Sequence, residues 1–362
     1  MNIVVLGGCG DMGSHVVREL LAHSEATVTI ADYRLERAKE LANELGERAR
    51  AAFVDANDEF SLLSVLEGAD AAVGCIGPFY AFAAKMAKAA VKAGVNYVDI
   101  CDDYGPIEEL FALDEAAKRA GVTVITGLGW TPGITNVLAK RGAEELDEVE
   151  EIKISWAGGA ADSTGLAVIM HVFYAIAGKV LTYKDGAWME VPAGSEAEVV
   201  EFPAPLGRIR VFHCGHPEPL TIPRYIKAKT VSLKGALTPD WNNKLADLFA
   251  RLGLIGTPAK NARMARIIHA IEGLFRMGGI AASGARVDVK GRKGGRQRTL
   301  SYSVVDRMGR LTAIPASIGA QWLAEGRIER KGVFAPEGCI EPAAFLTELS
   351  KRGIRVLEEE HG

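Results

Sequence analysis

The feature that most constrains the fold of this chain is a regular alternation of two kinds of segment over roughly its first 130 residues. Short apolar, β-rich runs recur about every 20 to 26 residues, and alanine-rich, charged segments separate them. One such segment carries Leu35, Ala38 and Leu45, whose spacing places them on one face of a helix. Strands that alternate with helices form βαβ units, so we expect an α/β fold with a doubly wound parallel sheet. The runs begin near Ile3, Thr27, Ala51, Ala71, Tyr97 and Val122.

A glycine-rich loop directly follows the first strand and precedes a helix. The loop is Gly8-Cys9-Gly10-Asp11-Met12-Gly13. We expect Gly8 to permit the tight turn, Gly10 to let a pyrophosphate approach the backbone, and Gly13 to allow close packing of helix on strand. The N-terminus of the helix offers N–H donors to the phosphates. The pattern predicts a dinucleotide site with all six residues beside the cofactor; a merely glycine-rich turn is the alternative.

The second strand ends in Asp32, 19 residues after Gly13. A carboxylate at this place accepts hydrogen bonds from both ribose hydroxyls and repels the 2′-phosphate of NADP. Arg34 lies two residues later and offers that phosphate a partner instead. We therefore expect NAD as the cofactor, with NADP as the alternative.

Two further loops are expected beside the cofactor, because ligands of open α/β sheets bind outside the carboxyl ends of the strands. Asp55 and Ala56 follow the third strand and are candidates for the adenine end, although a helix cap at Asn57 or Asp58 is the simpler interpretation. The fourth strand leads into a loop that is predicted to flank the cofactor, with a plain Gly-Pro turn as its alternative. Its residues are Ile76, Gly77 and Pro78.

The fifth strand ends in the pair Asp102-Asp103 at the same rim of the sheet. Such carboxylates can accept a proton or hold a substrate ammonium group. We expect one of the two to cap the helix that begins near Gly105-Pro106, leaving the other for chemistry. Cys101 has no histidine close by in the sequence and is a weak candidate for a nucleophile.

After Gly133 the pattern changes, because strand-like segments dominate and helical ones intervene. We expect a dinucleotide-binding domain over residues 1–133 and an α+β domain over residues 134–312. Residues 313–362 contain helical patterns that are expected to return to the first domain.

The second domain contains the polar run His213-Cys214-Gly215-His216, which at first sight suggests a metal site. On a strand His213 and Cys214 point to opposite faces, and a turn follows, so no metal is expected. His216 is then a candidate pocket histidine, with a structural role as the alternative. Arg224 is a candidate carboxylate clamp, because a guanidinium group binds carboxylates in bidentate fashion; it is equally consistent with an exposed charge.

Composition argues against several classes of partner. The net charge is −4, and the basic stretch from Arg286 to Arg298 has the pattern of a hairpin tip with one aromatic residue nearby, so no nucleic acid is expected. The longest uncharged helical stretch, Leu166 to Gly178, is too short to span a membrane. Five scattered cysteines and the lack of a visible signal peptide favour a cytoplasmic protein with reduced thiols.

Several motifs, in this order, resemble the saccharopine dehydrogenase/reductase-like family, which includes lysine 6-dehydrogenases and carboxynorspermidine dehydrogenases. They are the loop Gly8–Gly13, Gly77-Pro78, Tyr97-x-Asp99, Gly127-x-Gly129-x-x-Pro132-Gly133, and the tail segments Gly326–Ile328 and Gly332–Glu337. The resemblance implies a Rossmann domain with an inserted α+β domain for substrate binding and dimerisation, hence a homodimer.

The resemblance also implies hydride transfer between a nicotinamide and an amine-bearing carbon of an amino acid or opine. A base must take the nitrogen's proton, and the candidates are Asp102, Tyr104 and His216. Asp103, Thr131 and Arg224 are the candidate substrate contacts. An L-lysine 6-dehydrogenase is the favoured activity; the alternatives are a saccharopine reductase and a catalytically silent NAD-binding regulator.

Overall fold

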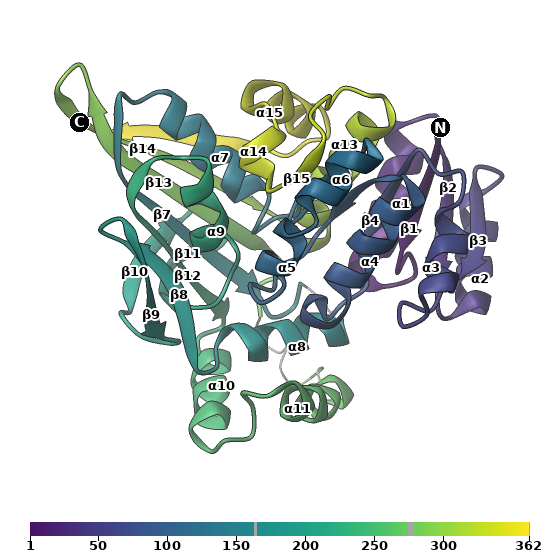
Figure 1. Ribbon diagram of the computed structural model, residues 1–362. Helices are drawn as coiled ribbons and strands as arrows, with labels where there is room; N and C mark the ends of the chain where they lie inside the picture. The colour runs from purple at the N-terminus through teal and green to yellow at the C-terminus, as the bar shows by residue number, and fades with distance from the viewer. Residues whose placement is uncertain (163–164, 272, 274–278, 362) are drawn as a thin grey trace. The chain divides into compact units, whose positions relative to one another are not determined.

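The computed structural model describes residues 1–162, 165–271, 273 and 279–361 (Figure 1). The chain forms two compact units. The first unit comprises Met1–Gly133 and Thr312–Ile340, and the second comprises Ile134–Leu311 and Glu341–Gly362. The two units therefore alternate along the chain, because each consists of two separate segments.

The first unit is built on a seven-stranded parallel sheet in the order β15-β6-β5-β4-β1-β2-β3. Its inner strands are buried on both faces, as the continuous apolar run Ile3–Leu6 requires. This strand order confirms the predicted doubly wound fold. The strands are β1 (Asn2–Leu6), β2 (Thr27–Asp32), β3 (Ala49–Phe53), β4 (Ala71–Gly74), β5 (Asn96–Asp99), β6 (Thr123–Ile125) and β15 (Gly332–Phe334).

Helices connect these strands and flank the sheet (Figure 1). Each buries an apolar stripe; α1, for example, buries Val16, Val17 and Leu20. Gly94 and Gly121 end their helices in the left-handed conformation that favours glycine. The helices are α1 (Asp11–His23), α2 (Leu35–Leu45), α3 (Glu59–Leu66), α4 (Phe79–Ala93), α5 (Ile107–Phe111), α6 (Asp114–Ala120) and α14 (Pro336–Cys339), and α13 (Met308–Ala324) enters the unit from the second one.

The second unit is built on a mixed sheet, which its described residues form from nine strands in the order β10-β11-β12-β7-β13-β14-β16, with β8 pairing with β12 and β9. Only β7 and β12 run parallel; the other pairs are antiparallel. The strands are β7 (Glu148–Gly159), β8 (Lys179–Lys184), β9 (Ala187–Pro192), β10 (Glu198–Phe202), β11 (Gly207–His213), β12 (Ala228–Thr238), β13 (Ser283–Lys293), β14 (Arg296–Asp306) and β16 (Val356–His361). The described helices are α7 (Ile134–Glu144), α8 (Leu166–Ala175), α9 (Glu218–Thr221), the 3-10 helix Ile222–Arg224, α10 (Trp241–Arg251), α11 (Pro258–Ala270) and α15 (Pro342–Lys351).

The C-terminal tail differs from the expected return of residues 313–362 to the first domain. Strand β15 does join the first sheet, beside β6. After Ile340, however, α15 packs on α7, and β16 pairs with β14 of the second unit. The edge of the long strand β14 offers backbone groups that β16 satisfies, and this pairing keeps the last residues in the second unit.

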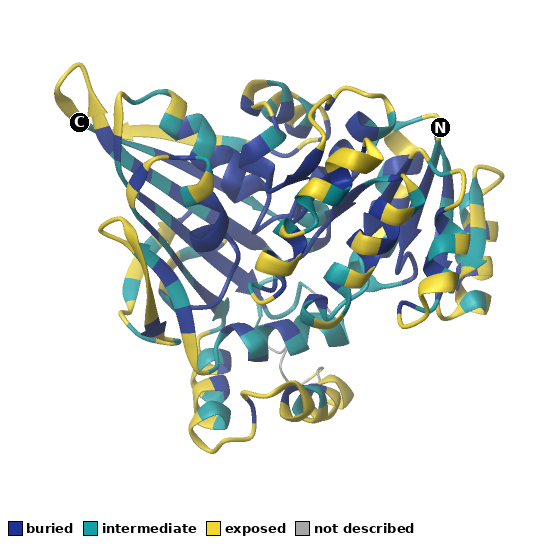
Figure 2. Cartoon of the chain, viewed as in Figure 1, coloured by how far each residue is buried: buried dark blue, intermediate teal, exposed yellow. Residues whose placement is uncertain are grey.

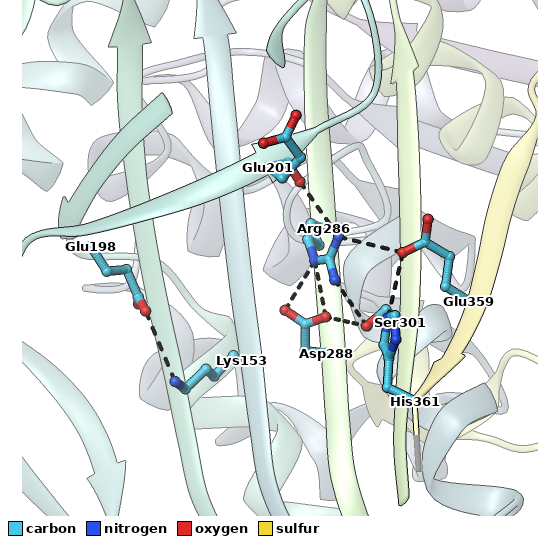
Figure 3. A network of polar contacts seen from close by, with 8 residues as sticks. All are labelled: Lys153, Glu198, Glu201, Arg286, Asp288, Ser301, Glu359 and His361. Atoms are coloured by element: carbon cyan, nitrogen blue, oxygen red, sulfur yellow. Dashed lines mark hydrogen bonds and ion pairs between the residues drawn. The ribbon is translucent and has the colours of Figure 1, made fainter. Parts of the chain in front are cut away.

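A polar network holds β16 to the second sheet (Figure 3). The Arg286 guanidinium group on β13 donates to Asp288 and to Ser301 of β14, and it forms an ion pair with Glu359 of β16. Three neighbouring strands thus share one cation.

Burial follows the sheets in both units: the central strands are dark blue in Figure 2, and the helices carry alternating exposed and buried bands. Within the part of the chain that the structure describes, none of the helices has the length and apolar character needed to cross a bilayer.

Candidate active site

The glycine loop of the first unit owes its shape to backbone atoms. Gly7 has a φ of +83°, and its N–H donates to the Ala31 carbonyl (2.7 Å). A Cβ atom on Gly13 would overlap with the Gly7 carbonyl oxygen, so only glycine lets α1 begin this close to the end of β1. The close packing predicted for Gly13 is confirmed. Gly8 lies in the tight turn expected there, which the hydrogen bond from the Gly10 N–H to the Gly7 carbonyl closes (2.9 Å), while the positive φ is that of Gly7.

Asp32 lies next to this loop at the end of β2 and is buried. Its Oδ2 accepts a hydrogen bond from the Cys9 N–H (3.1 Å), and its Oδ1 accepts from the backbone N–H and Nε of Arg34 (3.0 and 3.1 Å). Burial, followed by the charge of Asp32, raises the pKa of the Cys9 thiol to about 11. The thiol therefore stays neutral and adds no negative charge to a loop of the kind that binds pyrophosphate.

The loop after β3 is a turn that its own side chains organise. The Asp55 carboxylate accepts from the Asn57 N–H (2.8 Å), while Ser61 Oγ accepts from the Asp55 N–H (3.0 Å). Asp58 caps α3 by accepting from the Phe60 N–H (3.0 Å), which confirms the simpler interpretation for that residue. Ala56 is buried in the turn.

The loop after β4 runs beside the glycine loop. The Cys75 N–H donates to the Leu6 carbonyl (2.8 Å), and a Cβ atom on Gly7 would lie 2.9 Å from the Ile76 side chain. Ile76, Gly77 and Pro78 are half-buried and lead into α4, whose N-terminal cap is Pro78. The structure thus brings this predicted loop next to the predicted cofactor loop.

Asp99 connects the loop after β5 with the loop after β6 through hydrogen bonds. It was not singled out as a site residue from the sequence. Its buried carboxylate accepts from the Cys101 N–H (3.0 Å), the Thr126 hydroxyl (3.1 Å) and the Gly127 N–H (2.8 Å). Burial raises its pKa to about 6 although these hydrogen bonds favour the charged form. Asp99 therefore fixes the starts of the loops that carry Asp102 and Thr131.

Asp103 is buried, and its Oδ2 accepts from the Tyr80 N–H in the first turn of α4 (2.8 Å). The cap expected from Asp102 or Asp103 on the helix after Gly105-Pro106 is therefore wrong: α5 has no side-chain cap, and Asp103 serves α4 instead. Asp102 and Tyr104 are half-buried on the same loop, and Thr131 is buried on the loop after β6. The sheet explains this placement, because the carboxyl ends of parallel strands meet at one rim.

In the second unit, His216 belongs to a buried polar group that we call the histidine cluster: His171, His216, Glu218 and Thr135. The Nε2 atoms of His171 and His216 are 3.3 Å apart, and His216 Nδ1 lies 3.7 Å from Glu218 Oε2. The Thr135 hydroxyl donates to Glu218 Oε1 (2.9 Å). Burial, and then the nearby His171, lower the pKa of His216 well below its ordinary value, so its imidazole is neutral. Sequence reasoning found His216 alone, because His171 on α8 and Thr135 on α7 are far away in the sequence, and the burial of the nearby Glu218 could not be read from its spacing.

The other candidates of the second unit, which are His213, Cys214 and Arg224, do not belong to the histidine cluster. His213 Nε2 lies 3.2 Å from Glu196 Oε2, so His213 and His216 have different partners. Cys214 is buried, and this burial raises the pKa of its thiol well above its ordinary value. Arg224 is exposed, and its Nε donates to the Leu220 carbonyl (3.2 Å).

Two family models match the chain. The saccharopine dehydrogenase NADP binding domain matches residues 3–125, and the saccharopine dehydrogenase C-terminal domain matches residues 129–354, more than half of the chain. The chain belongs to the saccharopine dehydrogenase family. It is an NAD(P)-dependent oxidoreductase of that family, whose members are dehydrogenases acting on amine-bearing substrates.

Relatives of this saccharopine dehydrogenase family member include carboxynorspermidine synthase of Vibrio alginolyticus, which is 22% identical over 345 residues, or 85% of this chain and 82% of the relative. The NADP(+)-dependent, L-glutamate-forming saccharopine dehydrogenase of Schizosaccharomyces pombe is 28% identical over 162 residues, which cover 44% of this chain and 35% of that enzyme. The solved structure of the L-Glu-forming saccharopine dehydrogenase of Saccharomyces cerevisiae aligns over 100% of both chains with a TM-score of 0.72 at 19% identity, a likeness in fold.

Proposed function

We propose that this chain transfers a hydride between NAD(P) and the amine-bearing carbon of an amino acid or opine, and that L-lysine, oxidised at its side-chain amine, is the favoured substrate. The observation that carries the proposal is the glycine loop, where Gly13 lets the N-terminus of α1 begin against the end of β1. The carboxynorspermidine and saccharopine enzymes named among the relatives support an amine-bearing substrate.

The first unit supplies the proposed cofactor contacts. The backbone of Gly8–Gly13 faces the pyrophosphate, and Asp32 accepts from the adenosine ribose. Asp55 and Ala56 lie at the adenine end, and Ile76–Pro78 flank the nicotinamide side. When bound, the cofactor supplies the hydride acceptor, and the protein supplies binding, orientation and the exclusion of water.

We propose NAD as the preferred form because the buried Asp32 carboxylate is held in place by the Cys9 N–H and by Arg34, and would repel a 2′-phosphate. NADP is the alternative that the names of the family model and of several relatives support, and the exposed Arg34 is its proposed partner. Calorimetric titration of the full chain with both forms tests the choice: NAD should bind at least about tenfold more tightly, and the reverse ratio assigns NADP.

The proton that leaves the substrate nitrogen needs an acceptor. The candidates are Asp102 and Tyr104 in the first unit and His216 in the second. For the substrate itself we propose contacts with Asp103, Thr131 and Arg224, whose guanidinium group suits a carboxylate.

A substrate panel tests the activity. L-Lysine, other amino acids and opines are incubated with the full chain and with NAD or NADP, and reduced nicotinamide is followed by its near-ultraviolet absorbance. We expect reduction with L-lysine. Reductive formation of saccharopine from its amino acid and semialdehyde would favour the saccharopine reductase alternative. Binding of NAD without turnover of any amine would overturn the enzyme and leave the silent regulator.

We further propose a cytoplasmic homodimer. All five cysteines are free thiols, which suits a reducing compartment. Light scattering of the eluting protein should give twice the mass of the 38.6 kDa chain; the mass of one chain would refute the dimer.

A further inference from the structure

The histidine cluster buries three ionisable side chains, which costs folding free energy that an apolar core would not lose. The Glu218 side chain has no exposed surface, His216 is 3% exposed and His171 is 8% exposed. Burying a carboxylate costs several kcal/mol unless partners compensate, and apolar residues of similar size would pack as well. Buried titratable groups with specific partners mark candidate functional sites.

The cluster has an order, which its distances define. At the inner end, Glu218 Oε1 accepts from the Thr135 hydroxyl (2.9 Å), and Oε2 lies 3.7 Å from His216 Nδ1. At the other side of the same ring, His216 Nε2 meets His171 Nε2 at 3.3 Å, with the two rings nearly perpendicular at 87°. Exposure rises along this line from Glu218 to His171, so His171 is the outer end.

Neighbouring contacts hold the cluster in place. The Asn136 side-chain amide donates to the Thr221 hydroxyl (3.3 Å), so two successive residues of α7 bind both ends of α9. The Trp156 ring lies 5.5 Å from the His216 ring. The imidazole of His216 therefore has little freedom to turn away from its partners.

We propose that His171, His216 and Glu218 form a proton-transfer chain in which His171 takes the proton that the substrate nitrogen releases. His171 is then the catalytic residue, and His216 and Glu218 act through it as positioning residues. This inference rests on the proposed function and replaces His216 by His171 as the group that meets the substrate in the second unit.

The transfer balances. As the hydride leaves the amine-bearing carbon for the oxidised nicotinamide, the C=N bond forms and the nitrogen loses a proton to His171 Nδ1. His171 passes its Nε2 proton to His216 Nε2. The His216 Nδ1 proton then moves to Glu218 Oε2 once these two atoms, which lie 3.7 Å apart with no hydrogen bond between them, come within hydrogen-bond distance. Both imidazoles end neutral with their protons on the opposite nitrogen, and Glu218 holds the proton.

The first test needs no substrate. Histidines of the full chain are labelled with nitrogen-15, and their ring signals are followed in the wild type and in Glu218→Gln. Because a glutamine amide can donate to His216 Nδ1, which a carboxylate cannot do, we expect the His216 proton to move from Nδ1 to Nε2 and the His171 signal to change with it. The proton-transfer chain would be overturned if the His171 and His216 signals were unchanged by the substitution and titrated independently of each other.

The second test uses turnover. Glu218→Gln and His171→Asn should each lower kcat about 100-fold with KM changed less than about threefold, and added imidazole should partly restore the rate of His171→Asn. Thr135→Ser, which keeps the hydroxyl, should retain the rate that Thr135→Val loses. The matched control is His213→Asn, which removes a buried histidine whose partner Glu196 is exposed, and it should leave kcat unchanged.

Wild-type rates in Glu218→Gln and His171→Asn across the pH range would overturn the inference while the proposed function stands. A wild type that turns over no amine would overturn the proposed function, and the ring signals would then decide the proton chain by themselves.

Discussion

In the first unit the proposed cofactor loop is shaped by backbone atoms, whereas in the second unit the histidine cluster consists of side chains. Gly7 and Gly13 act through the side chains they lack, within seven residues of one chain segment. His171 and His216 are 45 residues apart in the sequence, and Thr135 and Glu218 are 83 apart. The difference suggests a division of work: a rigid backbone site for a cofactor shared by many enzymes, and side chains for the particular substrate.

The largest expected effect comes from breaking the backbone site. Gly13→Ala places a Cβ atom against the Gly7 carbonyl, so α1 must shift away from the loop. We expect the affinity for NAD(P) to fall about 100-fold or more, measured by calorimetric titration.

The control is Gly46→Ala, at a glycine with a φ of +90° and open space around it. The strained backbone should cost about 1 to 3 kcal/mol of stability and leave cofactor affinity unchanged. Equal losses of affinity in the two variants would show that general destabilisation, and not the loop, explains the result.

Asp99 tests whether a side chain supports the first unit's rim. Its pKa of about 6 exceeds its ordinary value, so the folded protein binds this proton more tightly than the unfolded chain does. Its contribution to stability is present below about pH 4 and is lost as the pH rises through about 6.

Asp99→Asn removes this titration and keeps the shape. Between about pH 4 and pH 7 the wild type should lose roughly 2 to 3 kcal/mol of unfolding free energy relative to the variant, measured by urea denaturation at each pH. Parallel curves for the two proteins would mean that Asp99 does not titrate in this range.

The sequence predicted the backbone-built region well and the side-chain-built region poorly. The alternation of segments and the glycine spacing gave the parallel sheet and the close packing at Gly13, because both depend on local sequence. The role of Asp103 was misassigned, because Tyr80, whose N–H it binds, lies 23 residues away. The pairing of β16 with β14 and the contact of His216 with His171 likewise depend on long-range contacts, which periodicity does not report.

A smaller effect is expected at Asp32 and Arg34, the two charged side chains proposed for cofactor choice. Asp32→Ala removes the carboxylate that would accept from the ribose, so NAD affinity should fall about tenfold while NADP affinity falls less or rises. Arg34→Ala is the counterpart and should weaken NADP alone. Unchanged NAD affinity in Asp32→Ala would refute the ribose contact.

The smallest effect comes from comparing the pair His216–Glu218, in which both side chains are buried, with the pair His213–Glu196, in which the glutamate is exposed. Glu196, whose side chain is 63% exposed, has its pKa lowered by the hydrogen bond with His213. Solvent screens such pairs, so Glu196→Gln should change stability by about 0.5 kcal/mol or less and leave turnover intact. A fall in kcat as large as that expected for Glu218→Gln would contradict the special role of the buried pair His216–Glu218.

The most direct measurement follows the hydride itself. L-Lysine that carries deuterium on the carbon of its side-chain amine is incubated with the full chain and oxidised NAD or NADP. The mass of the reduced cofactor is then measured by mass spectrometry. The account predicts one deuterium in the reduced nicotinamide. A chain that binds the cofactor but transfers no deuterium, from lysine or from any other amine labelled in the same way, would contradict it.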